Sequence, residues 1–195
     1  MRAHPKWRTR SVAAYFAIVM ISCALTSTSA VATEQPVLPG GGSLEAVLDK
    51  WRCAVSAYVD KIHSLPLELD DRYLALWPKR RPEYYVQCIF HDDDRQIYCE
   101  AASGFYRYAD RIASYATPQR LQALAQLGFS TDGSKGNFSQ DRDFHGASEV
   151  ATLMIETLAR VFELGERDIL EFAAPRLSQH RSNRVKADAA CALIS

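Results

Sequence analysis

The sequence predicts an α+β domain with an antiparallel sheet of about five strands and helices packed on one of its faces, in the order α-β-β-β-α-β-β-α. The first observation is strict apolar–polar alternation over residues 84–103, which is typical of half-buried antiparallel strands. The second is a pair of segments, 44–62 and 145–164, whose apolar residues recur at helical spacing. The third is a polar stretch, 129–144, which resembles a second hairpin.

Residues 1–32 have the three parts of a secretory signal peptide: a basic start, an apolar middle at 11–25, and the small-residue end Ala30-Val31-Ala32. The apolar run, about 15 residues, is shorter than the roughly 20 residues that a membrane-spanning helix needs. We therefore expect cleavage and export to the periplasm, the cell envelope or the extracellular space. The alternative is an uncleaved segment that anchors the protein in a membrane.

The charge that remains after cleavage excludes two classes of partner. Removing residues 1–32 leaves 19 of the 23 basic residues and all 23 acidic ones, so the mature domain is acidic. Nucleic acids and anionic membranes both require clustered basic charge, and neither is expected to bind. The short run Lys79-Arg80-Arg81 is expected to be a solvated loop.

The first half of the mature chain begins with residues 33–43, which are rich in Pro and Gly and are expected to form a flexible lead-in. Ser43 is a suitable N-cap for the helix at 44–62, which has one apolar stripe. Residues 72–77 are typical of a strand that ends at Pro78.

The central stretch, 84–103, predicts a hairpin with its turn in the acidic segment HDDDRQ. Centring the turn between Asp93 and Asp94 places Cys88 opposite Cys99, and both thiols then lie on the more apolar face. A four-residue loop would make them a non-hydrogen-bonded pair, where cross-strand disulfides fit best.

An even number of cysteines in an exported chain favours disulfides. Cys53, Cys88, Cys99 and Cys191 remain after cleavage and allow three connectivities. The hairpin register favours Cys88–Cys99, and Cys53–Cys191 follows by elimination. The alternative is a set of four buried free thiols.

In the second half, Thr117-Pro118 marks the start of a helix that stops at Gly128. The polar hairpin expected at 129–144 has DGSKG at its tip, and the long helix at 145–164 follows it. Further apolar residues before Pro175 suggest a short helix, namely Ile169, Leu170 and Phe172. The domain is therefore expected to cover 44–174, with a C-terminal tail at 175–195.

Several fragments of the chain resemble one protein family. They are Tyr85-Val86-Gln87, Glu100-Ala101-Ala102-Ser103, Leu124, Leu127-Gly128-Phe129, Asn137-Phe138, Val150-Ala151, Thr157-Leu158 and Val161-Phe162. Over roughly residues 80–165 they resemble the YbjN-like proteins, grouped with type III secretion chaperone-like (TY-Chap) peptide-binding domains. The resemblance implies a small α+β domain that binds protein segments, often as a dimer, without catalysis.

Known catalytic and nucleotide-binding motifs are absent from the sequence, so neither enzymatic activity nor a cofactor is expected. Two acidic stretches are candidates for metal sites. The turn at 91–94 places consecutive side chains in diverging directions, and Asp141-x-Asp143-x-His145 lacks a fourth ligand. No metal is expected at either.

The remaining candidate is a binding surface on the sheet face that points away from the helices, formed by Tyr85, Gln87, Ile89 and Tyr98. Exposed aromatic side chains favour contact with a partner. We expect a non-enzymatic, exported domain that binds a protein or peptide segment, and the competing use of the face is a homodimer interface. The alternative function is a small-molecule-binding or enzymatic cone-shaped α+β domain, with Asp141 and His145 in a pocket between helix and sheet.

Overall fold

The computed structural model describes residues 38, 42–69, 71–91, 95–106, 112–175, 177 and 183–185, and it confirms the α+β class. One antiparallel sheet has the strand order β4-β3-β2-β1-β5-β6. The helices and strands are α1 (Leu44–His63), β1 (Tyr73–Pro78), β2 (Val86–Phe90), β3 (Gln96–Ala101), α2 (Ile112–Tyr115), α3 (Pro118–Gln126), β4 (Phe138–Asp143), α4 (Ala147–Arg160), β5 (Leu170–Ala173) and β6 (Asn183–Arg184).

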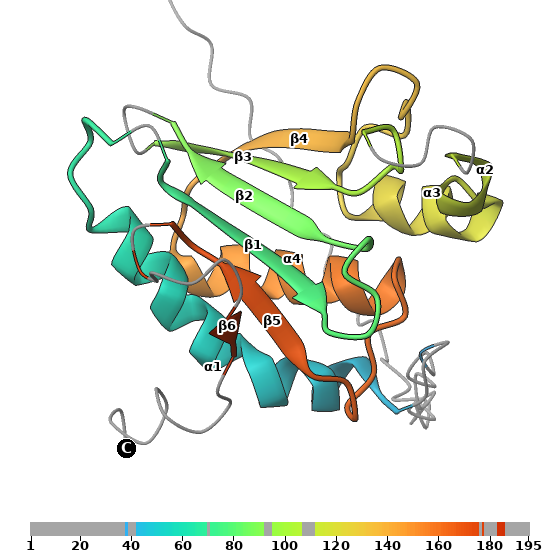
Figure 1. Ribbon diagram of the computed structural model, residues 1–195, viewed down its shortest axis with the longest axis horizontal. Coiled ribbons are helices and arrows are strands. Elements are labelled where there is room, and N and C mark those ends of the chain that lie inside the picture. Colours follow the sequence, from blue (N-terminus) through green and yellow to red (C-terminus); the bar gives the residue numbers. More distant parts are fainter. Residues whose placement is uncertain are drawn as a thin grey trace, which may run out of the picture. The chain divides into compact units, whose positions relative to one another are not determined.

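Helices α1 and α4 pack against each other and against one face of the sheet (Figure 1). The expected N-cap of α1 is confirmed, since the side chain of Ser43 accepts a hydrogen bond from the backbone of Ala46 over 3.1 Å. Alternate residues of the strands point into this layer and are buried, as Leu76, Val86 and Ile97 show. The hydrophobic core therefore lies between the sheet and the two long helices.

The hairpin of β2 and β3 has the predicted register, with Cys88 opposite Cys99. The backbone N–H of His91 donates to Gln96, so alternate pairs are hydrogen-bonded and the cysteines occupy a non-hydrogen-bonded position. Their Cα atoms are 4.1 Å apart and the two residues form the predicted disulfide. The turn residues 92–94 lie outside the described residues.

The second disulfide is only partly described. Cys53 is disulfide-bonded, but Cys191, the partner expected by elimination, lies outside the described residues. The Cys53–Cys191 pairing therefore stays a prediction. The predicted signal segment 1–32 is also outside them, and the described part of the chain has no helix that is both long and apolar enough to cross a membrane.

The expected second hairpin is wrong in one arm. Only β4 is a strand within 129–144, and the residues before it form turns. Asp132 accepts a hydrogen bond from the backbone of Ser134, and the side chain of Ser130 accepts one from the backbone of Asp132. These local bonds compete with a strand ladder, although the backbone of Ser130 still donates to Ser139 of β4.

The short helix expected around Ile169–Phe172 is wrong, because Leu170–Ala173 is strand β5. Leu170 and Phe172 are buried while Glu171 and Ala173 are partly exposed, which is the two-residue period of a strand. This segment pairs with β1, so a distant strand determines its conformation. A four-residue apolar run does not carry that information in its own sequence.

Candidate functional site

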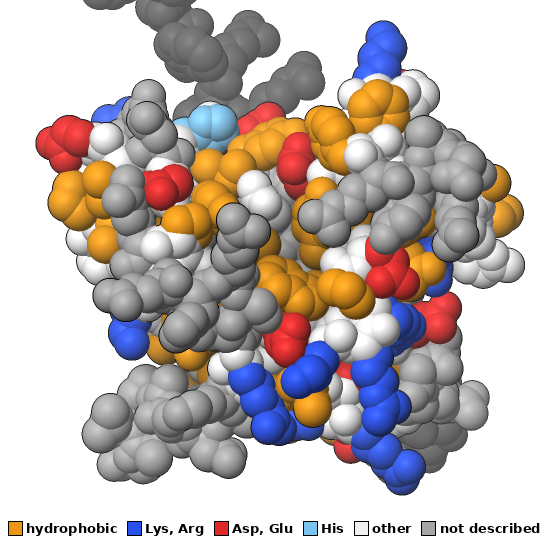
Figure 2. Space-filling view, viewed as in Figure 1, with side chains coloured by type: hydrophobic (Ala, Val, Ile, Leu, Met, Phe, Trp, Pro, Cys, Tyr) orange, Lys and Arg blue, Asp and Glu red, His pale blue; other side chains and the backbone are white. Residues whose placement is uncertain are grey.

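The sheet face that α1 and α4 leave uncovered is called here the outer face. Figure 1 shows the sheet from this side, with α4 behind it, and Figure 2 shows hydrophobic side chains across its middle with acidic ones among them. The strand registers place these residues on it: Ser139, Asp141, Asp143, Gln96, Tyr98, Glu100, Gln87, Ile89, Tyr73, Ala75, Trp77, Glu171 and Ala173. Polar and aromatic side chains are thus mixed on this surface.

The structure brings the four predicted binding residues together on the outer face. Ile89 lies directly opposite Tyr98, and Gln87 lies opposite Glu100. Tyr85 precedes β2 and its carbonyl accepts a hydrogen bond from Ala102, which continues the same ladder. All of these side chains are half-buried, so part of each remains exposed.

Both tyrosines of the predicted set, Tyr85 and Tyr98, are held by hydrogen bonds to a buried asparagine or a glutamate. The Nδ2 of Asn137 donates to the hydroxyl of Tyr85 over 2.7 Å and to the Oε2 of Glu100 over 3.2 Å. The hydroxyl of Tyr98 donates to the other oxygen of Glu100 over 2.9 Å. The backbone N–H of Ser103 donates to the side-chain oxygen of Asn137. We call these five residues the Asn137 cluster.

The hydrogen bonds of the Asn137 cluster hold the hydroxyl groups of Tyr85 and Tyr98. Burial raises the pKa of Tyr98, and hydrogen bonding and charge from Glu100, with the charge of Asp141, add to this effect, while a hydrogen bond to Ser139 opposes it. Tyr98 therefore stays a neutral hydrogen-bond donor at neutral pH. A surface whose side chains are already oriented loses less conformational entropy on binding.

The cluster also joins fragments that are far apart in the sequence. Tyr85, Glu100, Ser103 and Asn137 each belong to a stretch that carries the family resemblance. Residues 45–176 match the family described as T3SS (YopN, CesT) and YbjN peptide-binding chaperone 3, or TY-Chap3, a match that spans more than half of the chain. The chain belongs to this family. No curated protein and no solved structure matches it significantly.

The outer face of this TY-Chap3 domain includes residues that the sequence reasoning missed. Tyr73 and Trp77 of β1 lie on it, and the alternation within residues 72–77 was a signal that could have identified them. The indole N–H of Trp77 donates to the carboxylate of Glu171 over 3.2 Å. Glu171 gave no such signal, because its segment was expected to be helical.

The alternative pocket pair is not brought together in the TY-Chap3 domain. Asp141 contacts His91 over 3.1 Å on the exposed end of the outer face, and His145 is exposed beyond β4. Within the described ranges, no group of three or more His, Cys, Asp or Glu residues could hold a metal ion. The segment 92–94 of the first acidic stretch lies outside those ranges.

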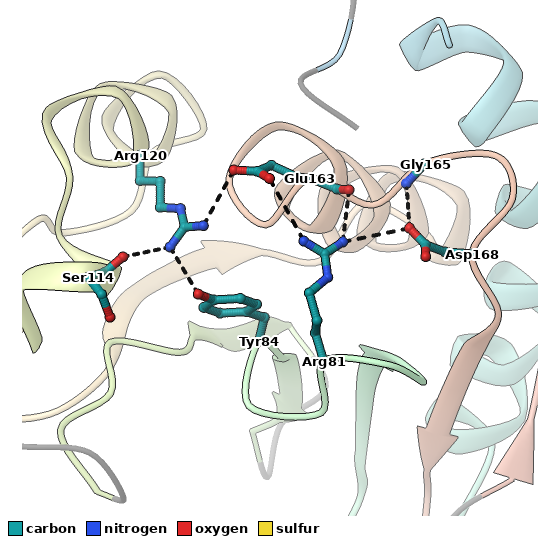
Figure 3. Close-up of polar contacts among 7 residues, drawn as sticks. All are labelled: Arg81, Tyr84, Ser114, Arg120, Glu163, Gly165 and Asp168. Atoms are coloured by element: carbon teal, nitrogen blue, oxygen red, sulfur yellow. Dashed lines mark hydrogen bonds and ion pairs between the residues drawn. The ribbon is translucent and has the colours of Figure 1, made fainter. Parts of the chain in front are cut away.

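A second polar network closes one end of the TY-Chap3 domain, and it corrects the expectation of a wholly solvated basic loop. Arg81 donates to the carbonyl of Glu163 over 2.9 Å and pairs with Asp168 over 3.6 Å (Figure 3). Arg120 of α3 pairs with Glu163 over 3.5 Å and stacks on the ring of Tyr84. These contacts join the β1–β2 loop, α3 and the end of α4, which indicates a structural role.

Proposed function

We propose that the outer face binds an extended protein or peptide segment without catalysing a reaction. The observation that carries this proposal is the group of half-buried aromatic and aliphatic side chains on the sheet face that α1 and α4 leave uncovered, with Tyr85 and Tyr98 held in place by the Asn137 cluster. Tyrosine and tryptophan supply much of the binding energy at protein interfaces. The description of the family as peptide-binding chaperones supports the same function.

The outer face is a better candidate than the β4 edge of the sheet. The backbone N–H of Phe144 donates to the carbonyl of Arg95, the residue before β3. The backbone groups of residues 138, 140 and 142 of β4 therefore point toward β3. The outward groups belong to Ser139, whose carbonyl already accepts a bond from Ser130, and to Asp141 and Asp143. A short edge with charged side chains discourages strand addition. Binding is therefore proposed through side chains on the face.

The layer between helices and sheet supports binding rather than a helix–sheet pocket. The buried polar residues of the described chain are Arg72, Ser103, Asn137 and Thr157. Arg72 donates to the carbonyl of His63, and Thr157 donates to the carbonyl of Leu153 in its own helix. These two side chains bond to separate backbone carbonyls rather than to each other. Ser103 and Asn137 belong to the Asn137 cluster.

The proposed place of action is outside the cytoplasm. The Cys88–Cys99 disulfide and the bonded state of Cys53 support export, because such bonds persist in oxidising compartments. The signal-like sequence at 1–32 supports it independently. Mass analysis of the protein from its native host tests this: a mature form lacking residues 1–32, with bonded cysteines, is expected. A full-length, fully reduced protein would contradict export.

The binding proposal is tested with Ile89→Glu, which places a charge at the centre of the outer face without removing a member of the Asn137 cluster. Binding to an array of synthetic peptides is expected to fall at least about tenfold, because a carboxylate would have to be desolvated. Leu67→Glu is the matched control, since Leu67 is 49% exposed in the loop after α1. Unchanged peptide binding by the Ile89 variant would show that this face is not the site.

The same variant separates peptide binding from self-association. Sedimentation of the wild-type protein and the Ile89→Glu variant reports whether the outer face is buried in a dimer. A wild-type dimer that the substitution dissociates, together with no peptide binding by either protein, would assign the face to a dimer interface. A monomeric wild type that binds peptides supports the proposed function.

A further inference from the structure

Negative charge is concentrated on one half of the outer face. The outward positions of β3 and β4 hold Gln96, Tyr98, Glu100, Ser139, Asp141 and Asp143, so three of these six are acidic and none is basic. Arg142 points to the opposite side of the sheet, where it pairs with Glu149. Among the described residues on this half of the face, the contact between His91 and Asp141 pairs a carboxylate with a basic side chain.

The other half of the face is different. Glu171 of β5 pairs with Lys79 over 3.5 Å and lies opposite Arg184 of β6. By contrast, no described lysine or arginine lies within salt-bridge distance of Glu100, Asp141 or Asp143. A cationic group is therefore attracted more strongly to the β3–β4 side than to the other half of the face.

A row of side chains runs across the strands from the acidic half to the aromatic one. Asp141, Tyr98, Ile89 and Tyr73 are directly opposite one another on β4, β3, β2 and β1. At about 4.8 Å per strand the row is roughly 14 Å long, which matches about four residues of extended chain. The hydroxyl of Tyr98 donates to Glu100, and Tyr98 lies opposite Asp141 on β4. An aromatic ring face also attracts cations.

We infer that the outer face selects segments in which a lysine or arginine lies about two to four residues from an aromatic or aliphatic side chain. The cation contacts the Tyr98 ring beside Glu100 and Asp141, and the apolar side chain packs on Ile89 and Tyr73. This inference rests on the proposed function and specifies the partner's chemistry. An acidic segment, or an anionic lipid surface, is repelled by the same carboxylates.

The test uses three sets of short synthetic peptides with the same apolar residues and with Lys, Gln or Glu at the variable position. The mature wild-type protein is expected to bind the Lys set best and the Glu set least. Exposed ion pairs contribute about 0.2–1 kcal/mol each, so two of them predict roughly a twofold to thirtyfold preference for Lys over Gln at low salt. Added salt reduces this preference.

The decisive variant is Asp141→Asn/Asp143→Asn, which removes two exposed charges and leaves the Asn137 cluster intact. It is expected to lose most of the preference for Lys, whereas the control Asp49→Asn/Asp60→Asn changes two exposed carboxylates on α1 and keeps it. Circular dichroism confirms that both variants fold.

The outcomes separate this inference from the function on which it rests. Equal binding of the three peptide sets by the wild type overturns the charge preference and leaves peptide binding intact. A Lys preference that survives Asp141→Asn/Asp143→Asn overturns the assignment to the β3–β4 half. Binding of no peptide set overturns both the inference and the proposed function.

Discussion

The side-chain amide of Asn137 donates to the hydroxyl of Tyr85 across 52 positions of sequence, over 2.7 Å. The same nitrogen also donates to Glu100, so one asparagine that is 8% exposed orients two side chains of the outer face. Buried polar networks of this kind stabilise a fold only when every member keeps its partner. The network is therefore sensitive to the loss of a single side chain.

Asn137→Ala is expected to lower the free energy of unfolding by about 1–3 kcal/mol, because it leaves Glu100 and the backbone of Ser103 with unsatisfied groups. Urea denaturation measures the change. Ser134→Ala, in the exposed loop before β4, is the control and is expected to have little effect. A change below about 0.5 kcal/mol for Asn137→Ala would contradict a structural role for the cluster.

Cys88→Ala/Cys99→Ala is expected to lower the free energy of unfolding by about 2–4 kcal/mol, since the disulfide closes a loop between residues 11 positions apart. Denaturation with and without a reducing agent measures the loss. In the double variant, the reducing agent is expected to cause no loss of stability through the Cys88–Cys99 bond, because that bond is already absent. Equal stability of wild type and variant under oxidising conditions would indicate that the bond is not formed in solution.

Glu163 has a backbone φ of 60°, a conformation that costs a non-glycine residue about 1 kcal/mol or more. Glu163→Ala removes the carboxylate that pairs with Arg81 and Arg120 and keeps the strained backbone. Glu163→Gly removes the same carboxylate but relieves the strain, so it is expected to be the more stable of the two by about 1 kcal/mol. Thermal denaturation compares them, and a less stable glycine variant would contradict strain at this position.

Tyr98 is expected to contribute to the alkaline unfolding of the domain. Its folded pKa is raised above the ordinary value of 10.0, so the unfolded state loses the proton first. Stability from this difference is complete below pH 10 and declines as the pH rises through the folded pKa. Tyr98→Phe removes this contribution and is expected to flatten the fall in stability above pH 10. An unchanged slope would show that other groups cause it.

The sequence was most informative where one segment determines its own structure. Alternation and an acidic turn predicted β2, β3 and the Cys88–Cys99 register, and Ser43 and Thr117 predicted the starts of α1 and α3. Prediction from the sequence failed where contacts with another segment determine the conformation. Residues 170–173 form a strand because they pair with the edge of β1. Residues 129–137 do not form the predicted strand, because side chains such as Asp132 bond to the local backbone.

The candidate site was predicted in part for the same reason. Tyr85, Gln87, Ile89 and Tyr98 follow from the period of the hairpin, which is a local property. Glu100 and Asn137 were recognised only as fragments of a family pattern, because nothing in a linear sequence shows that their side chains meet. Tyr73 and Trp77 became part of the face through the pairing of β1 with β2 and β5.

The position of β1 has a consequence for the order in which the domain is completed. β1 joins β2 on one side and β5 on the other, although β5 comes only after α4 in the chain. A nascent or truncated polypeptide that stops before residue 170 leaves the apolar strand β1 with an unpaired edge, which is a template for aggregation. Completion of β5 therefore covers the edge of β1 that would otherwise favour aggregation.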